Sequence, residues 1–139
     1  MTHLLLSEAK IVPAIPATAG AVAAFTAVEV DGTGYSRACF VIDLGTAAAN
    51  GTFDCKVTNS DVSGGTFHDV TDAALAQVLK AAGDGKVEII DMPIAADHPI
   101  LLLAGSVGTG AWPNSAVCIL YKGSRINPPT QAAGQVIQL

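Results

Sequence analysis

Two acid-imidazole neighbours, His68-Asp69 and Asp97-His98, come closest in this chain to a general acid-base pair. Such a pair needs a carboxylate that orients the imidazole ring. Adjacent side chains of an extended strand point to opposite faces, so direct neighbours orient one another poorly. We therefore expect turn or surface roles for both pairs, with a small hydrolase that uses His68 or His98 as an alternative.

Other motifs of catalysis and ligand binding do not occur in the sequence. There is no Gly-x-Ser-x-Gly elbow, and the glycine-rich stretch 105–110 matches neither the dinucleotide fingerprint nor the phosphate-binding loop. Four carboxylates that could offer oxygen ligands to calcium surround a predicted hairpin: Asp54, Asp61, Asp69 and Asp72. No calcium-binding loop orders them, so we expect no metal site, no cofactor and no catalytic residue.

The three cysteines, Cys39, Cys55 and Cys118, lie in apolar runs and lack the Cys-x-x-Cys spacing of zinc and redox sites. We expect buried, reduced thiols. Their odd number argues against a disulfide framework and favours a reducing compartment. Residues 1–8 lack the basic region of a signal peptide, and prolines interrupt the apolar stretch 11–30, so we expect neither a signal peptide nor a membrane segment.

The composition indicates a surface that is poor in charge. The chain has 139 residues, the size of one domain, and is 50% hydrophobic but only 14% charged, against about 25% in an average soluble domain. Such a surface suggests coverage in an assembly. Seven scattered basic residues against twelve acidic ones give a formal charge of -5, which excludes nucleic acid as a partner because it binds clustered cations.

The stretch 52–70 predicts the hairpin that organises the fold. Phe53, Cys55 and Val57 alternate with polar residues, which is the period of a half-buried strand. A Ser/Asp/Gly-rich segment follows and favours reversal of the chain, after which Phe67 and Val70 return to the core. Residues 71–80 have helical spacing, although a bulged strand competes with a helix there.

The remaining pattern predicts short strands separated by turns, at 22–30, 35–44, 86–92, 99–107 and 116–122. The apolar run of 35–44 is continuous, which places this strand at the centre of a sheet. The order of elements predicts an all-β, antiparallel jelly-roll-like sandwich with extended arms, and an immunoglobulin-like sandwich is the alternative.

A single domain would span 1–139. We expect an extended N-terminal arm at 1–20, because its prolines exclude a helix, then the sandwich at 21–122 and a C-terminal tail at 123–139. An apolar arm gains stability mainly by lying along another surface, either its own sheet or a partner subunit. Trp112 lies in a glycine-rich loop and is either a core plug or a contact anchor.

Three stretches of the sequence resemble one known family: 30–45 reads VDGTGYSRACFVIDLG, 53–61 reads FDCKVTNSD, and 64–70 reads GGTFHDV. They resemble small proteins that many tailed phages encode near the major capsid protein. In size and layout the chain is most similar to the capsid cement, or decoration, proteins of short-tailed, Bordetella-type phages. The resemblance covers about two thirds of the chain, residues 30–122.

The resemblance implies a jelly roll that assembles as a small homo-oligomer, with a dimer favoured, on the outer face of an icosahedral shell. There it would clamp neighbouring subunits of the major capsid protein. Synthesis in the host bacterial cytoplasm would precede its place on the virion capsid surface. The family has no catalytic residues to carry over.

The resemblance and the apolar arms together predict where the chain binds the capsid or a sister subunit. The candidate interface residues are Leu4, Leu5, Leu6, Ile11, Val12, Ile15, Trp112, Ile126, Val136 and Ile137. The alternative function is a ligand-binding, carbohydrate-binding β-sandwich module, in which Trp112 and Tyr35 would stack on sugar rings.

Overall fold

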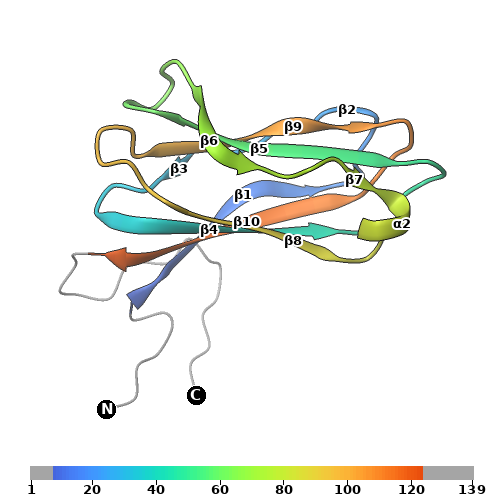
Figure 1. Ribbon diagram of the computed structural model, residues 1–139, viewed down its shortest axis with the longest axis horizontal. Helices are drawn as coiled ribbons and strands as arrows, with labels where there is room; N and C mark the ends of the chain where they lie inside the picture. Colours follow the sequence, from blue (N-terminus) through green and yellow to red (C-terminus); the bar gives the residue numbers. More distant parts are fainter. Residues whose placement is uncertain (1–7, 124–139) are drawn as a thin grey trace, which may run out of the picture.

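The computed structural model describes residues 8–123 and is a sandwich of two antiparallel sheets, one above the other (Figure 1). The four-stranded sheet has the order β1 (Lys10–Thr18), β10 (Asn114–Gly123), β4 (Tyr35–Leu44) and β8 (Val87–Pro93). The second sheet has the order β2 (Ala23–Ala24), β9 (Ile100–Gly108), β5 (Thr52–Ser60) and β6 (His68–Ala74). The expected all-β antiparallel sandwich is confirmed.

Three short elements complete the described part of the chain. β3 (Val30–Asp31) pairs with β9, and β7 (Val78–Leu79) pairs with β5. α2 (Lys80–Gly83) is a single helical turn that leads from β7 toward β8.

Alternate strand positions fill the core between the sheets. Phe40 and Ile42 of β4 are fully buried, as are Phe53 and Val57 of β5. Each such side chain contributes roughly 1.5–3 kcal/mol when it leaves water. β4 lies between β10 and β8, so the prediction of a central strand at 35–44 is confirmed.

The predicted hairpin is also confirmed, because β5 pairs antiparallel with β6 and Asn59 lies opposite His68. Its loop is held by Glu29, whose carboxylate accepts hydrogen bonds from the Ser63 hydroxyl at 2.5 Å and the Gly64 N–H at 2.9 Å. The Ser63 hydrogen bond is the main reason that the pKa of Glu29 is lowered. These two hydrogen bonds attach the loop between β5 and β6 to the segment just before β3.

Trp112 closes one end of the core. Its side chain is completely buried, its indole Nε1–H donates to the Gly45 carbonyl at 2.8 Å, and its ring meets Phe53 edge to face at 6.4 Å. The Trp112 N–H in turn donates to the carbonyl of Gly20. Gly20 has a φ of +67°, and a Cβ there would lie 1.7 Å from the Trp112 carbonyl oxygen, so only glycine fits.

The helix predicted at 71–80 is wrong. Asp72 has a φ of +63°, which ends any helix, and Val78 pairs with Phe53 instead. The β5–β6 register shifts between Lys56 and Thr58, so the competing bulged strand is the observed structure. The helical spacing was misleading because pairing with β5 outweighs the local propensity.

The N-terminal segment also differs in part from the expectation. Residues 10–18 of the expected arm form β1, which lies along β10 of the protein's own sheet and buries Ala14 and Ile15. The strand expected at 22–30 is reduced to the two-residue strands β2 and β3, with Phe25 between them stacked on Phe53 at 5.5 Å. β10 continues to Gly123, and the rest of the expected tail lies outside the described residues.

Candidate interaction surface

The outer face of the four-stranded sheet carries apolar side chains on all four strands. We call it the apolar face, and it is formed by Ile11, Pro13, Cys39, Val41, Val87, Ile89, Val117 and Ile119. The pairing register aligns one uninterrupted apolar row across the sheet, which runs Pro13, Val117, Val41, Ile89. Because neighbouring side chains in a strand alternate, these residues point away from the core that Phe40 and Ile42 fill.

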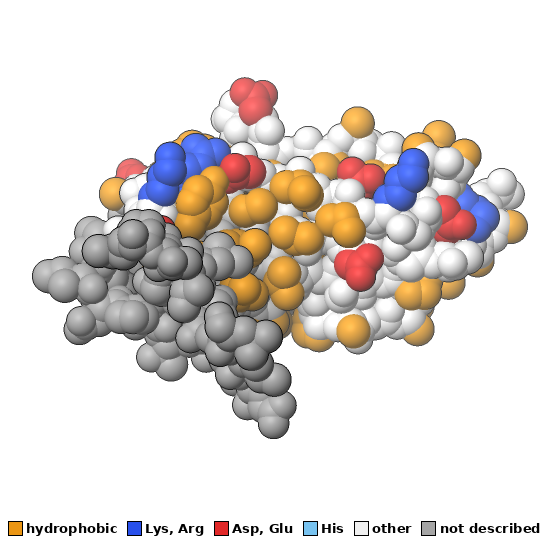
Figure 2. All heavy atoms as spheres, turned by 90° about the horizontal axis from the view of Figure 1, so that it is seen from below, with side chains coloured by type: hydrophobic (Ala, Val, Ile, Leu, Met, Phe, Trp, Pro, Cys, Tyr) orange, Lys and Arg blue, Asp and Glu red, His pale blue; other side chains and the backbone are white. Residues whose placement is uncertain are grey.

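Several side chains of the apolar face are strongly exposed. Ile89 is 59% exposed, Val87 50% and Val117 40%. Figure 2 shows hydrophobic side chains gathered on this face, with charged groups around them. A contiguous apolar patch with a polar rim is typical of a surface that binds another protein.

A polar cluster joins three strands at one end of the apolar face. Arg37 Nε donates to the Tyr121 hydroxyl oxygen at 2.9 Å, Arg37 Nη2 lies 3.2 Å from the Asp91 carboxylate, and the Tyr121 hydroxyl donates to Asp91 at 2.7 Å. The hydrogen bond with Asp91 raises the pKa of Tyr121. Because the Arg37–Asp91 ion pair is partly exposed, water screens the attraction and the pair contributes little to folding. Its chemistry suits recognition, since Arg and Tyr are frequent at protein interfaces.

The outer face of the second sheet is polar by contrast. Lys56 forms an ion pair with Asp69 at 2.7 Å, and Gln77 Nε2 donates to the Asp54 carboxylate at 3.0 Å. The two faces of the sandwich therefore differ in character, and the apolar face is the candidate interaction surface.

The predicted interface residues fall into three groups. Ile11 lies on the apolar face, whereas Val12 packs against the core and Ile15 is buried within it. Six of the predicted residues lie outside the described part of the chain: Leu4, Leu5, Leu6, Ile126, Val136 and Ile137.

Trp112 and Tyr35 both face the interior. Trp112 is 0% exposed and Tyr35 is 8% exposed. Of the two roles considered for Trp112, the structure thus has the core plug. Neither ring presents a face on which a sugar could stack, so a carbohydrate-binding module would need other residues.

The two acid-imidazole pairs lie at the surface and apart from the apolar face. His98 Nδ1 is 3.2 Å from the Asp97 carboxylate in a turn, where the rule of opposite faces does not apply, and this hydrogen bond lowers the pKa of Asp97. In β6 the rule does apply, since Asp69 pairs with Lys56 rather than with His68. Residues 8–123 contain no group of three or more His, Cys, Asp or Glu side chains placed to hold a metal ion.

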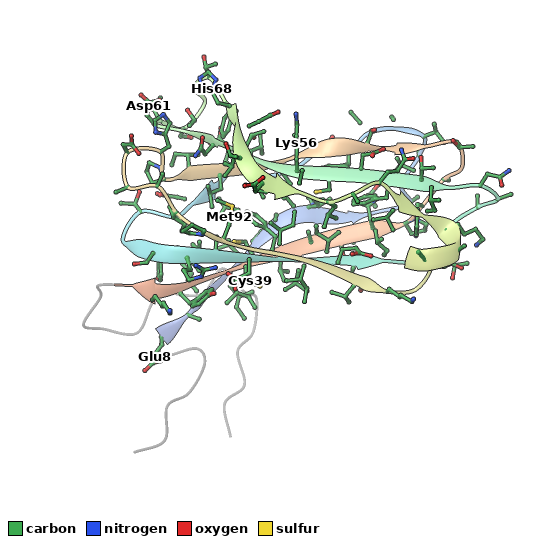
Figure 3. All side chains as sticks on the ribbon, viewed as in Figure 1. Glu8, Cys39, Lys56, Asp61, His68 and Met92 are labelled. Atoms are coloured by element: carbon green, nitrogen blue, oxygen red, sulfur yellow. The ribbon has the colours of Figure 1, made fainter. Side chains whose placement is uncertain are left out.

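The three cysteines are free thiols with different exposure. Cys55 and Cys118 are buried, and burial raises the pKa of each to about 12. Cys39 is partly exposed on the apolar face, and burial also raises its pKa, with Asp91 adding to the effect. Figure 3 shows Cys39 on the lower sheet and Lys56 on the upper one. Because Cys39 lies on the apolar face, the reactivity of its thiol would fall when another molecule covers that face.

Sequence reasoning missed most of the apolar face. Val41, Val117 and Ile89 belong to strands whose apolar residues continue on both parities, and this pattern predicts a strand covered on both faces. In the sandwich one face of β4 and β10 packs on the core, and the other is the apolar face. Apolar residues at both odd and even positions of these strands were therefore the available signal for an apolar outer face.

Comparison with protein-family profiles and with curated proteins finds no match for this chain. Within the described part of the chain, no helix is long and apolar enough to cross a membrane. The apolar face is therefore interpreted from its own chemistry.

Proposed function

We propose that the protein is a structural component of a phage virion that binds the outer face of the icosahedral capsid and stabilises contacts between subunits of the major capsid protein. The observation that carries the proposal is the apolar face, which crosses all four strands of one sheet while the opposite sheet is polar. The resemblance in residues 30–122 supports the capsid as the partner. On this proposal the apolar face lies on the capsid and the polar sheet faces solvent.

The mechanism is stabilisation by binding to the assembled shell. A protein that binds only the assembled state stabilises it by RT ln(1 + [L]/Kd) at each site, which is about 2.7 kcal/mol when the free concentration is 100 times Kd. Many copies bind one shell, so modest contacts add up. The apolar row of β1, β10, β4 and β8 would supply the desolvated centre, and Arg37 and Tyr121 the polar rim.

The proposal is tested by mixing the purified full chain with empty shells assembled from the major capsid protein of the same phage. We expect saturable co-sedimentation with the shells and a higher melting temperature of the decorated shells. A chain that stays in the supernatant at saturating concentration and leaves the shell melting temperature unchanged would contradict the proposal.

A further inference from the structure

The lateral edges of the two sheets differ in how well they are protected from pairing with another strand. β1 carries Pro13 and Pro16, which lack the N–H of a ladder, and its register shifts twice. β6 is bulged and contains Asp72 with a φ of +63°. β2 and β3 are only two residues long each. Prolines, bulges and short strands are the usual devices that block edge pairing.

β8 is the edge that lacks such a device over most of its length. Seven consecutive residues, from Val87 to Pro93, pair with β4 without a register shift, and the single proline is the last of them. The two edge-strand side chains Val87 and Ile89 are 50% and 59% exposed. A long, regular, apolar edge strand is a template for a further strand.

The hydrogen-bond pattern fixes which backbone groups of β8 point outward. The Leu44 N–H donates to the Lys86 carbonyl, and the Ile94 N–H donates to the Ser36 carbonyl, at 2.9 Å each. In an antiparallel ladder the bonded pairs alternate, so the even-numbered residues of β8 bond to β4. The backbone N–H and C=O groups of Val87, Ile89 and Asp91 consequently point to the open edge.

We propose that β8 pairs antiparallel with β8 of a second copy of this chain, with Ile89 opposite the partner's Ile89 across a twofold axis. Each outward-pointing residue then finds a bonded partner, because Val87 lies opposite the partner's Asp91. Such an antiparallel pair forms about six backbone hydrogen bonds. The twofold axis makes one strand complementary to itself, so no second kind of edge is needed.

Charge selects this register over its neighbours. A twofold axis at Glu88 would place the Glu88 carboxylates of the two copies opposite each other. An axis at Asp91 would place the two Asp91 carboxylates opposite each other. Like charges directly opposite on paired strands are destabilising. An axis at Ile90 sets exposed Ile89 opposite a carboxylate. The axis at Ile89 instead places Ile89, the most exposed side chain of the apolar face, against its own copy, and leaves the less exposed Val87 opposite Asp91.

The pairing also extends the candidate interaction surface. Ile89 and Val87 belong to the apolar face, and a twofold axis perpendicular to the sheet keeps the outer faces of both copies on one side. Two four-stranded sheets then become one eight-stranded sheet with a single apolar face. This dimer forms in solution, so its test needs no capsid and is independent of the proposed function.

The proposal is tested by sedimentation velocity of the full chain over a concentration series, with two β8 variants and one control. Ile89→Pro removes an N–H that points away from β4, so the ladder inside the protein stays intact. Ile89→Lys places two cations opposite each other on the axis. The control is Val62→Lys, the same substitution at a residue that is 56% exposed in the hairpin loop. Circular dichroism checks that each variant is folded.

We expect the wild-type chain and Val62→Lys to sediment as dimers of the 14.0 kDa chain. Ile89→Pro and Ile89→Lys should each raise the dimer dissociation constant at least ~10-fold. A second readout tests the register: in a Cys39→Ser background, Ile89→Cys should form a disulfide-linked dimer on oxidation, and Val87→Cys should not. A monomeric wild type, a folded Ile89→Lys variant that dimerises normally, or cross-linking through Val87→Cys alone would overturn the proposal.

Discussion

Replacement of Trp112 by alanine tests the role of this residue as the plug of the core. The side chain is 0% exposed, so its truncation removes a large apolar group and leaves a cavity, which costs roughly 3–5 kcal/mol. Against a total stability of ~5–15 kcal/mol, this is a large fraction. With a urea dependence of about 2 kcal/mol per molar, the unfolding midpoint should fall by about 2 M.

A second variant separates the hydrogen bond of Trp112 from its packing. Trp112→Phe keeps much of the ring but removes the Nε1–H, leaving the Gly45 carbonyl without that donor, and should cost about 1–3 kcal/mol. Far-UV circular dichroism is the suitable probe, because Trp112 is the only tryptophan and its fluorescence is lost in both variants. Val117→Ala on the apolar face is the control, with an expected change below ~1 kcal/mol. A Trp112→Ala variant that loses under ~1 kcal/mol would refute the assignment to the core.

Three further predictions concern acid stability, thiol access and a backbone position. The Asp84 carboxylate accepts a 2.6 Å hydrogen bond from the Ala47 N–H, which lowers the pKa of Asp84 in the folded protein. The ionised carboxylate therefore stabilises the fold fully above the unfolded-state pKa of about 3.9. This stabilisation is lost as the pH falls through the lower pKa of the folded state. Asp84→Asn should flatten stability against pH in that acidic window. A thiol reagent should label the native chain at Cys39 and leave the two buried cysteines unlabelled until unfolding. Gly20→Ala should destabilise by at least about 1 kcal/mol in urea unfolding, because the added Cβ meets the Trp112 carbonyl.

Each of these predictions has a result that contradicts it. An Asp84→Asn variant with the acid profile of the wild type would show that the hydrogen bond to Ala47 does not stabilise the fold. Rapid labelling of all three thiols in the native state would place Cys55 and Cys118 at the surface. A Gly20→Ala variant as stable as the wild type would show that the backbone at Trp112 can accommodate a Cβ at position 20.

Strand pairing was predictable from the sequence where local pattern and long-range pairing agree. Residues 35–44 became β4 because their apolar run is bounded by turn residues at both ends, and β5 followed from the strict alternation of Phe53, Cys55 and Val57. The segment 71–80 failed for the opposite reason. Its helical spacing is local, whereas Asp72 takes a positive φ and Val78 pairs with β5.

The candidate interaction surface was predicted less well than the fold. Apolar composition placed the binding residues in the arms, yet Val12 and Ile15 of β1 face the core. A surface patch depends on which parity of each strand meets the core and on the order of strands in the sheet. The sequence of a single strand determines neither the buried parity nor the strand order. Val117 and Ile89 lie on one face because β4 pairs with both β10 and β8.

The central claim, that the apolar face binds the capsid, is tested most directly by co-sedimentation of two matched lysine variants with empty shells. Val117→Lys places a charge within the apolar row, and Val62→Lys places the same charge in the exposed hairpin loop away from that row. We expect Val117→Lys to lose at least ~10-fold in affinity for the shell while Val62→Lys binds like the wild type. A folded Val117→Lys variant that decorates shells as well as the wild type would contradict the account.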